Sequence, residues 1–175
     1  MDREERTGRS AAALEQMQAQ IQAFSDAVER AGTAMRARDA ERFLRQYEWL
    51  QKRVHAALHE GGWTEDALLQ ALCDAAVECW RLERICEKAV MRMDLLHAQP
   101  FANRYSWFRS RMDDALMTAG IQTVDLTGEI YSVGMAVSAL NADEFDDENA
   151  RVVQMVDPIV MADGHVLRTG TVMLG

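Results

Sequence analysis

Apolar residues recur at alternating spacings of three and four near the start of the chain, without a break through three heptads. Two apolar positions in seven form a narrow helical stripe, which is typical of a coiled-coil seam rather than a broad core face. The pattern predicts self-association into a homodimer, although one amphipathic helix packed on its own domain would look similar. The predicted dimerisation residues are Leu14, Met17, Ile21, Phe24, Val28 and Met35.

The phase of the stripe changes beyond Met35, because Arg38 and Arg42 occupy the next seam positions. We interpret this change as a bend within one long coiled-coil helix over residues 11–60, preceded by a disordered segment at 1–10. We also expect a soft point in the helix where the phase changes. A second apolar series then comprises Ala40, Phe43, Tyr47, Leu50, Val54 and Ala57.

Residues 61–120 carry the signals of further helices and are predicted to form a helical bundle region. Thr64 is a good N-cap for a second helix, which we expect to end near Pro100 because proline disfavours helix at the preceding residue. A third helix is predicted over about residues 101–119. Gly120 follows it at the position where a left-handed residue often ends a helix.

Short β-rich runs replace the helical pattern in residues 121–175. Asp163-Gly164 lies between two apolar runs, which is a strong signal for a tight hairpin turn. We place Val166 and Val172 in the core of this hairpin. The chain is therefore predicted to be an α+β protein, with a long N-terminal coiled-coil helix, a helical middle region and a compact C-terminal β-domain.

The net charge of −9 is concentrated in residues 113–175, which hold eleven acidic and two basic side chains. Such a segment repels phosphate backbones, so we expect no nucleic-acid partner. It would be attracted to a basic protein surface, or it would serve solubility alone. No apolar run is long enough to span a membrane, and the charged N-terminus does not resemble a signal peptide, so the prediction is a cytoplasmic protein without a membrane partner.

The sequence contains none of the common phosphate-binding, hydrolase or metalloprotease motifs. Cys73, Cys79 and Cys86 fit the apolar face of a helix, and their spacings do not match a zinc site. His55 and His59 share a helix face but lack a third ligand nearby. We therefore expect a protein that works by binding, not an enzyme, with no cofactor and no metal.

The last segment, "ADGHVLRTGTVML", resembles the closing pattern of the GrpE family, L-x-G-R-V-L-R-P-A-x-V-x-V. Upstream, "MDDALMTAGIQTV" is similar to the final helix and first strand of that family. The similarity covers about residues 110–175, and the helical part agrees in architecture only. The matching positions are Gly164, Val166, Leu167, Arg168, Val172 and Leu174, and the departures are Ser132, Val133, Ala136, Ile159, Val160, His165 and Thr169.

The resemblance implies a co-chaperone that binds the ATPase domain of a DnaK-type chaperone as a dimer. A GrpE-like β-domain enters the nucleotide-binding cleft, favours its open state and thereby promotes release of ADP. The implied partner-binding residues are Val156, His165, Arg168 and Leu174. A structural ion pair is the alternative role for Arg168, and core packing is the alternative for Val156 and Leu174.

Two other functions fit the same sequence. The first is a coiled-coil dimeric adaptor that docks through its β-domain without nucleotide exchange. The second is an enzyme with a pocket at the junction of the helices and the β-domain, which requires a concave site with convergent polar groups.

Overall fold

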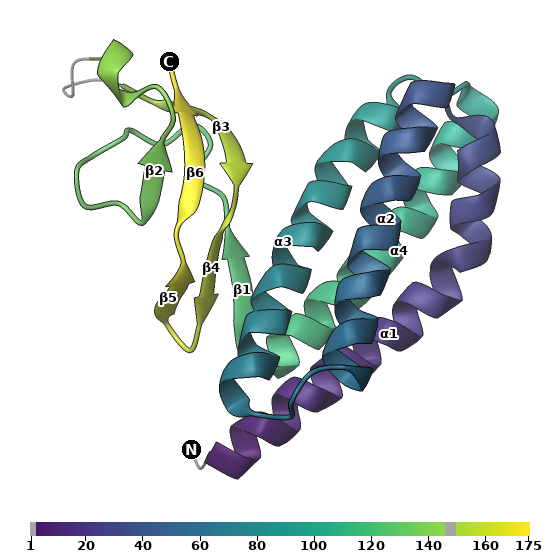
Figure 1. Ribbon diagram of the computed structural model, residues 1–175. Helices are drawn as coiled ribbons and strands as arrows, with labels where there is room; N and C mark the ends of the chain where they lie inside the picture. Colours follow the sequence, from purple (N-terminus) through teal and green to yellow (C-terminus); the bar gives the residue numbers. More distant parts are fainter. Residues whose placement is uncertain (1–2, 146–149) are drawn as a thin grey trace.

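The computed structural model describes residues 3–145 and 150–175, and its helices form an antiparallel four-helix bundle (Figure 1). Each helix runs opposite to the one before it. α1 packs on α2 and α4, and α3 packs on the same two helices. The four helices are α1 (Arg3–Ala34), α2 (Ala37–His59), α3 (Glu65–Val90) and α4 (Leu95–Thr118).

The single long helix predicted over residues 11–60 is not confirmed. α1 ends at Ala34 and α2 begins at Ala37, so the change of phase marks a tight reversal of the chain. Residues 3–10, which were expected to be disordered, form the first turns of α1. The reversal is favourable because it lets the chain cover its apolar stripe with its own helices.

All six predicted dimerisation residues lie in the core of this bundle, so the stripe no longer supports a dimer. Leu14 and Met17 are 0% exposed. Phe24 stacks on Phe108 of α4, with ring centroids 4.4 Å apart. The buried set is Leu14, Met17, Ile21, Phe24, Val28 and Met35.

The second apolar series forms the buried face of α2. Phe43 and Leu50 are fully buried, and the Tyr47 hydroxyl donates a hydrogen bond to the backbone carbonyl of Ile21 in α1. Arg42 is exposed on the other side of the helix. The arginines thus interrupt the α1 stripe because the chain has already turned and started a helix with its own phase.

The boundary between α3 and α4 lies earlier than the sequence predicts. Thr64 caps α3 as expected, since its side chain accepts a hydrogen bond from the backbone N–H of Ala67 at 3.3 Å. α3 then ends at Val90, and Asp94 caps α4 by accepting from the backbone N–H groups of two following residues. Pro100 therefore lies inside α4 and does not end α3.

Two three-stranded sheets form the C-terminal β-domain, which confirms a small β-domain after the helices. One sheet has the order β1-β4-β5 and is antiparallel, and the other has the order β2-β6-β3, with β2 parallel to β6. The strands are β1 (Ile121–Val124), β2 (Val137–Ala139), β3 (Val152–Asp157), β4 (Ile159–Ala162), β5 (His165–Arg168) and β6 (Gly170–Leu174).

The last four strands make one long bent hairpin that contributes to both sheets. Its turn is Asp163-Gly164, with φ of +48° and +82°, which confirms the tight turn predicted from the sequence. Pro158 separates β3 from β4, and Thr169 separates β5 from β6. At the bend Gly170 is closely packed, since an added Cβ would lie 3.0 Å from the carbonyl oxygen of Asp157.

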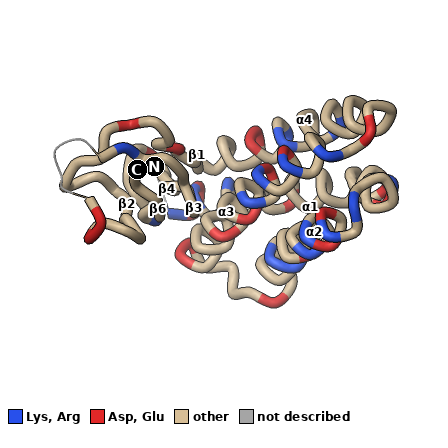
Figure 2. The backbone as a smooth tube through the Cα atoms, turned by 90° about the horizontal axis from the view of Figure 1, so that it is seen from above, with Lys and Arg blue, Asp and Glu red and all other residues tan. Residues whose placement is uncertain are grey.

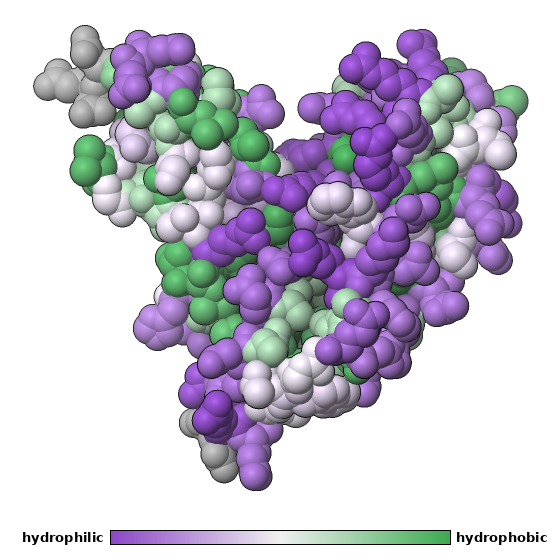
Figure 3. Space-filling model, viewed as in Figure 1, coloured by the Kyte–Doolittle hydropathy of each residue, from purple (hydrophilic) through white to green (hydrophobic). Residues whose placement is uncertain are grey.

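The β-domain packs along α3 and shares apolar contacts with the bundle (Figure 1). Ile121, Val160 and Ala162 extend the bundle core into the first sheet. In the opposite direction, Trp80 of α3 enters the core of the second sheet and packs with Met155, among others. A notch separates the upper parts of the two units in the space-filling view (Figure 3).

Candidate functional site

The hairpin residues predicted to bind a partner do not all reach the surface. His165 is exposed beside the turn, and Val156 is half-buried. Leu174 is only 4% exposed and belongs to the core of the second sheet, as the core-packing alternative requires. Arg168 is half-buried, and its guanidinium lies 3.2 Å from the Asp74 carboxylate of α3, so it makes an ion pair with the bundle.

Val166 lies on the surface, which contradicts its predicted place in the core. Its side chain is 45% exposed, whereas Val172 is fully buried as expected. β5 is an edge strand of the first sheet, so one side of the strand has no neighbouring strand to cover its side chains. Val166 and its neighbour Leu167 therefore present apolar surface next to His165.

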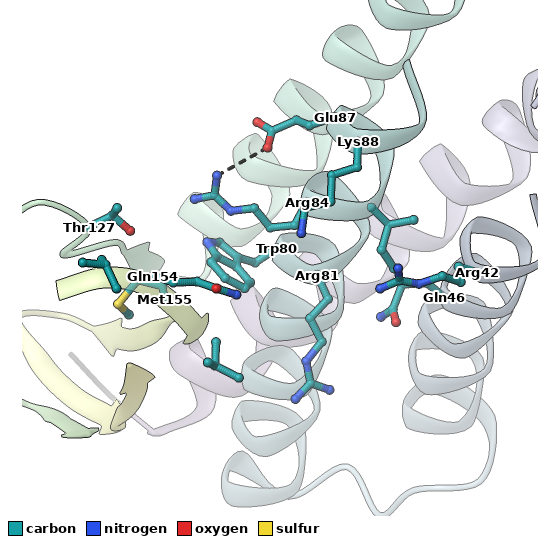
Figure 4. Close-up of a pocket in the computed structure, with 13 residues that line it drawn as sticks. Arg42, Gln46, Trp80, Arg81, Arg84, Glu87, Lys88, Thr127, Gln154 and Met155 are labelled. Carbon is teal, nitrogen blue, oxygen red and sulfur yellow. Dashed lines mark hydrogen bonds and ion pairs between the residues drawn. The ribbon is translucent and has the colours of Figure 1, made fainter. Parts of the chain in front are cut away.

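A broad groove of about 570 Å³ crosses the face of α3 between α2 and β3 (Figure 4). α2 contributes Arg42 and Gln46, and β3 contributes four consecutive residues, 153–156. Trp80, Arg84 and Lys88 come from α3, where spacings of four place them in one row. The helical side of the groove is therefore basic. Its strand side combines apolar side chains with the amide side chain of Gln154.

Two arginines of the groove bind carboxylates of the β-domain. Arg81 donates to Asp157 at 2.6 Å, and Arg84 pairs with Asp125 and lies over the Trp80 ring, 4.9 Å from its centroid. Burial alone would raise the pKa of the Asp125 carboxyl, but hydrogen bonds from Thr127 and the charge of Arg84 outweigh burial and lower it. These pairs join the acidic β-domain to the basic face of α3.

The other two cations of the groove have a different environment. Arg42 and Lys88 are exposed, and neither makes an ion pair with any residue that the structure describes. Basic residues are unevenly distributed over the whole molecule: Figure 2 shows many Lys and Arg on the helices and few in the β-domain. A site with free cations beside an aromatic ring and aliphatic side chains is suited to binding an anionic ligand.

Local patterns in the sequence do not predict this groove, because its residues come from four separate segments: α2, α3, the loop that holds Thr127, and β3. In the sequence, Trp80 fits the apolar pattern of α3, and Arg42 only interrupts the apolar stripe. The row of Trp80, Arg84 and Lys88 at spacings of four was the one available signal. It predicts a shared face but not the strand that lies opposite.

The buried cysteines do not form a reactive site. Burial raises the pKa of the Cys73 thiol to about 11 and that of Cys79 to about 12, and it also raises the pKa of Cys86. Thiols with such pKa values are protonated at neutral pH and react slowly. Among the described residues, no group of three or more His, Cys, Asp or Glu side chains is arranged to hold a metal ion.

Comparison with protein-family models, curated proteins and solved structures finds no match to this chain. In the part of the chain that the structure describes, none of the helices combines the length and apolar character needed to cross a membrane.

Proposed function

We propose that this chain is a GrpE-like co-chaperone whose β-domain binds the ATPase domain of a DnaK-type chaperone and promotes release of ADP. The observation that supports it best is the β4–β5 hairpin, whose tight turn presents His165, Val166 and Leu167 to solvent. The same segment carries the similarity to the closing pattern of the GrpE family. We expect the protein to act in the cytoplasm, without covalent chemistry, cofactor or metal.

The contacts between the β-domain and α3 support this mechanism. A binding element favours the open form of a cleft when it fits that form better than the closed one, and holding the element in one fixed orientation sharpens this preference. The β-domain is held on α3 in this way by the packing of Trp80 and by the Arg81–Asp157 and Arg168–Asp74 ion pairs. Binding that prefers the open form then weakens nucleotide affinity by the same coupling factor.

The proposal requires only one chain for each ATPase domain. The described part of one chain contains four packed helices, and the apolar stripe from Leu14 to Met35 is buried within them. A homodimer would need another surface. Sedimentation of the purified chain distinguishes one chain from two.

Binding is tested with a double variant of the hairpin, Val166→Asp with Leu167→Asp. Both side chains are partly exposed, so the variant should fold, and buried charge at a contact should weaken affinity for the ATPase domain by about tenfold or more. The matched control is Leu95→Asp with Leu96→Asp, two exposed residues at the far end of the bundle. Equal affinities of the two variants and the wild type would exclude the hairpin as the contact.

A further inference from the structure

We infer that the groove between α2, α3 and β3 binds an extended acidic segment of a partner protein. This inference does not depend on the proposed co-chaperone function, because the groove and the exposed hairpin are different surfaces. Three features support it: two cations without an ion-pair partner among the described residues, the open edge of β3 over residues 153–156, and the apolar surface between them.

Charge complementarity identifies the kind of ligand. Arg81 and Arg84 are already neutralised by carboxylates of the β-domain, whereas Arg42 and Lys88 point into the same groove with no ion-pair partner among the described residues (Figure 4). Two carboxylates from outside the chain can therefore take these cations without displacing an internal pair. The chain's net charge of −9 makes this basic groove a local exception that attracts acidic segments.

The strand side of the groove favours an extended backbone. β3 is an edge strand in the sheet order β2-β6-β3. Its first residue, Val152, exchanges backbone hydrogen bonds with Gly128 and Glu129 on the outer side, so the open edge begins at residue 153. Its residues 153–156 all line the groove and span roughly 13 Å at ~3.3 Å per residue. Two irregularities in its register with β6 bend the strand, which limits any pairing to a short segment.

Apolar side chains in the groove require that the ligand also carry apolar groups. Val153 is 55% exposed on β3, and Ile85 lines the groove from α3. A segment that alternates acidic and aliphatic residues would place its carboxylates on the face toward Arg42 and Lys88 and its aliphatic side chains on the opposite face. A free phosphate satisfies the charge but not this apolar surface, whereas an oligonucleotide has bases that can stack on it and is therefore included in the test as a competitor.

The test uses the full chain and a fluorescent peptide that alternates Glu and Val, with a Lys/Val peptide for comparison. We expect the acidic peptide to bind, with an affinity that falls as the salt concentration increases. The double variant Arg42→Glu with Lys88→Glu should bind it about tenfold more weakly than the wild type. The control variant, Lys52→Glu plus Arg104→Glu, makes the same change of charge at exposed sites outside the groove and should bind normally.

Three results would overturn the inference. The acidic peptide fails to bind, or the control variant loses as much affinity as the groove variant, which would indicate a general charge effect. Alternatively, inorganic phosphate or a single-stranded oligonucleotide competes better than the unlabelled peptide, which would assign the groove to a phosphate ligand. All four substituted residues are exposed, and unchanged melting curves of both variants verify that each chain folds.

Discussion

Replacement of Trp80 by alanine tests how the β-domain is held on the bundle. The indole comes from α3 but is only 6% exposed and packs in the core of the second sheet. Burying a tryptophan removes about 200 Å² from water, which at ~25 cal/mol/Å² gives an upper bound of about 5 kcal/mol. Because measured costs of this substitution are ~3–5 kcal/mol, we expect Trp80→Ala to lower the free energy of unfolding of the β-domain by about 3–4 kcal/mol.

The loss should be confined to the β-domain. Trp80 is absent from the main core of the bundle, so amides of α1 and α4 should keep their protection from hydrogen exchange while amides of β3 and β6 lose theirs. Chemical denaturation followed by circular dichroism should separate into two transitions. The control is Trp107→Ala, which removes an indole that is 53% exposed and should cost about 1 kcal/mol or less.

Two results would refute this reasoning. A cost of less than about 1 kcal/mol for Trp80→Ala would show that the indole contributes no more than a surface residue. Equal loss of protection in the bundle and in the β-domain would show that the two units unfold together, so that Trp80 is part of one shared core.

Three further predictions concern single residues. Gly170→Ala should destabilise the chain by about 1–3 kcal/mol in thermal unfolding, because the added methyl group meets backbone and packed side chains at the bend; an unchanged melting temperature would contradict this packing. Asp94→Ala should cost about 1 kcal/mol through loss of the α4 cap, and Asp94→Asn should restore most of it. The Asp125 carboxyl has a lowered pKa in the folded chain, so it stabilises the fold above its unfolded pKa of ~3.9, and that contribution is lost as pH falls below it. Asp125→Asn should therefore reduce stability at pH 7 and flatten the acid dependence below about pH 4, and parallel pH profiles of variant and wild type would refute this role.

Local signals in the sequence predicted the corresponding local structure. Thr64 caps a helix, Gly120 ends one with a left-handed conformation, and Asp163-Gly164 forms a tight turn. Each of these features depends on a few neighbouring residues whose backbone preferences are strong. The division into helices followed by a β-domain was predicted for the same reason, since the spacing of apolar residues changes after residue 120.

Predictions that depended on which surfaces meet were less successful. A stripe from Leu14 to Met35 has the same spacing whether it faces a second chain or the chain's own helices, and the second arrangement is the one observed. Val166 follows the alternation of a core strand but lies on an uncovered edge. The groove around Trp80 is not predictable from local patterns, because it forms only when β3 lies opposite α3 and nothing local in either segment specifies that contact.

The rate of ADP release from the ATPase domain of the cognate DnaK-type chaperone tests the central proposal most directly. With a fluorescent ADP analogue in a stopped-flow experiment, saturating wild-type chain should accelerate release, and the Val166→Asp, Leu167→Asp variant should require a higher concentration for the same effect. The Leu95→Asp, Leu96→Asp variant should match the wild type. Tight binding without any acceleration would identify an adaptor and contradict the exchange function, and absence of binding would contradict the partner as well.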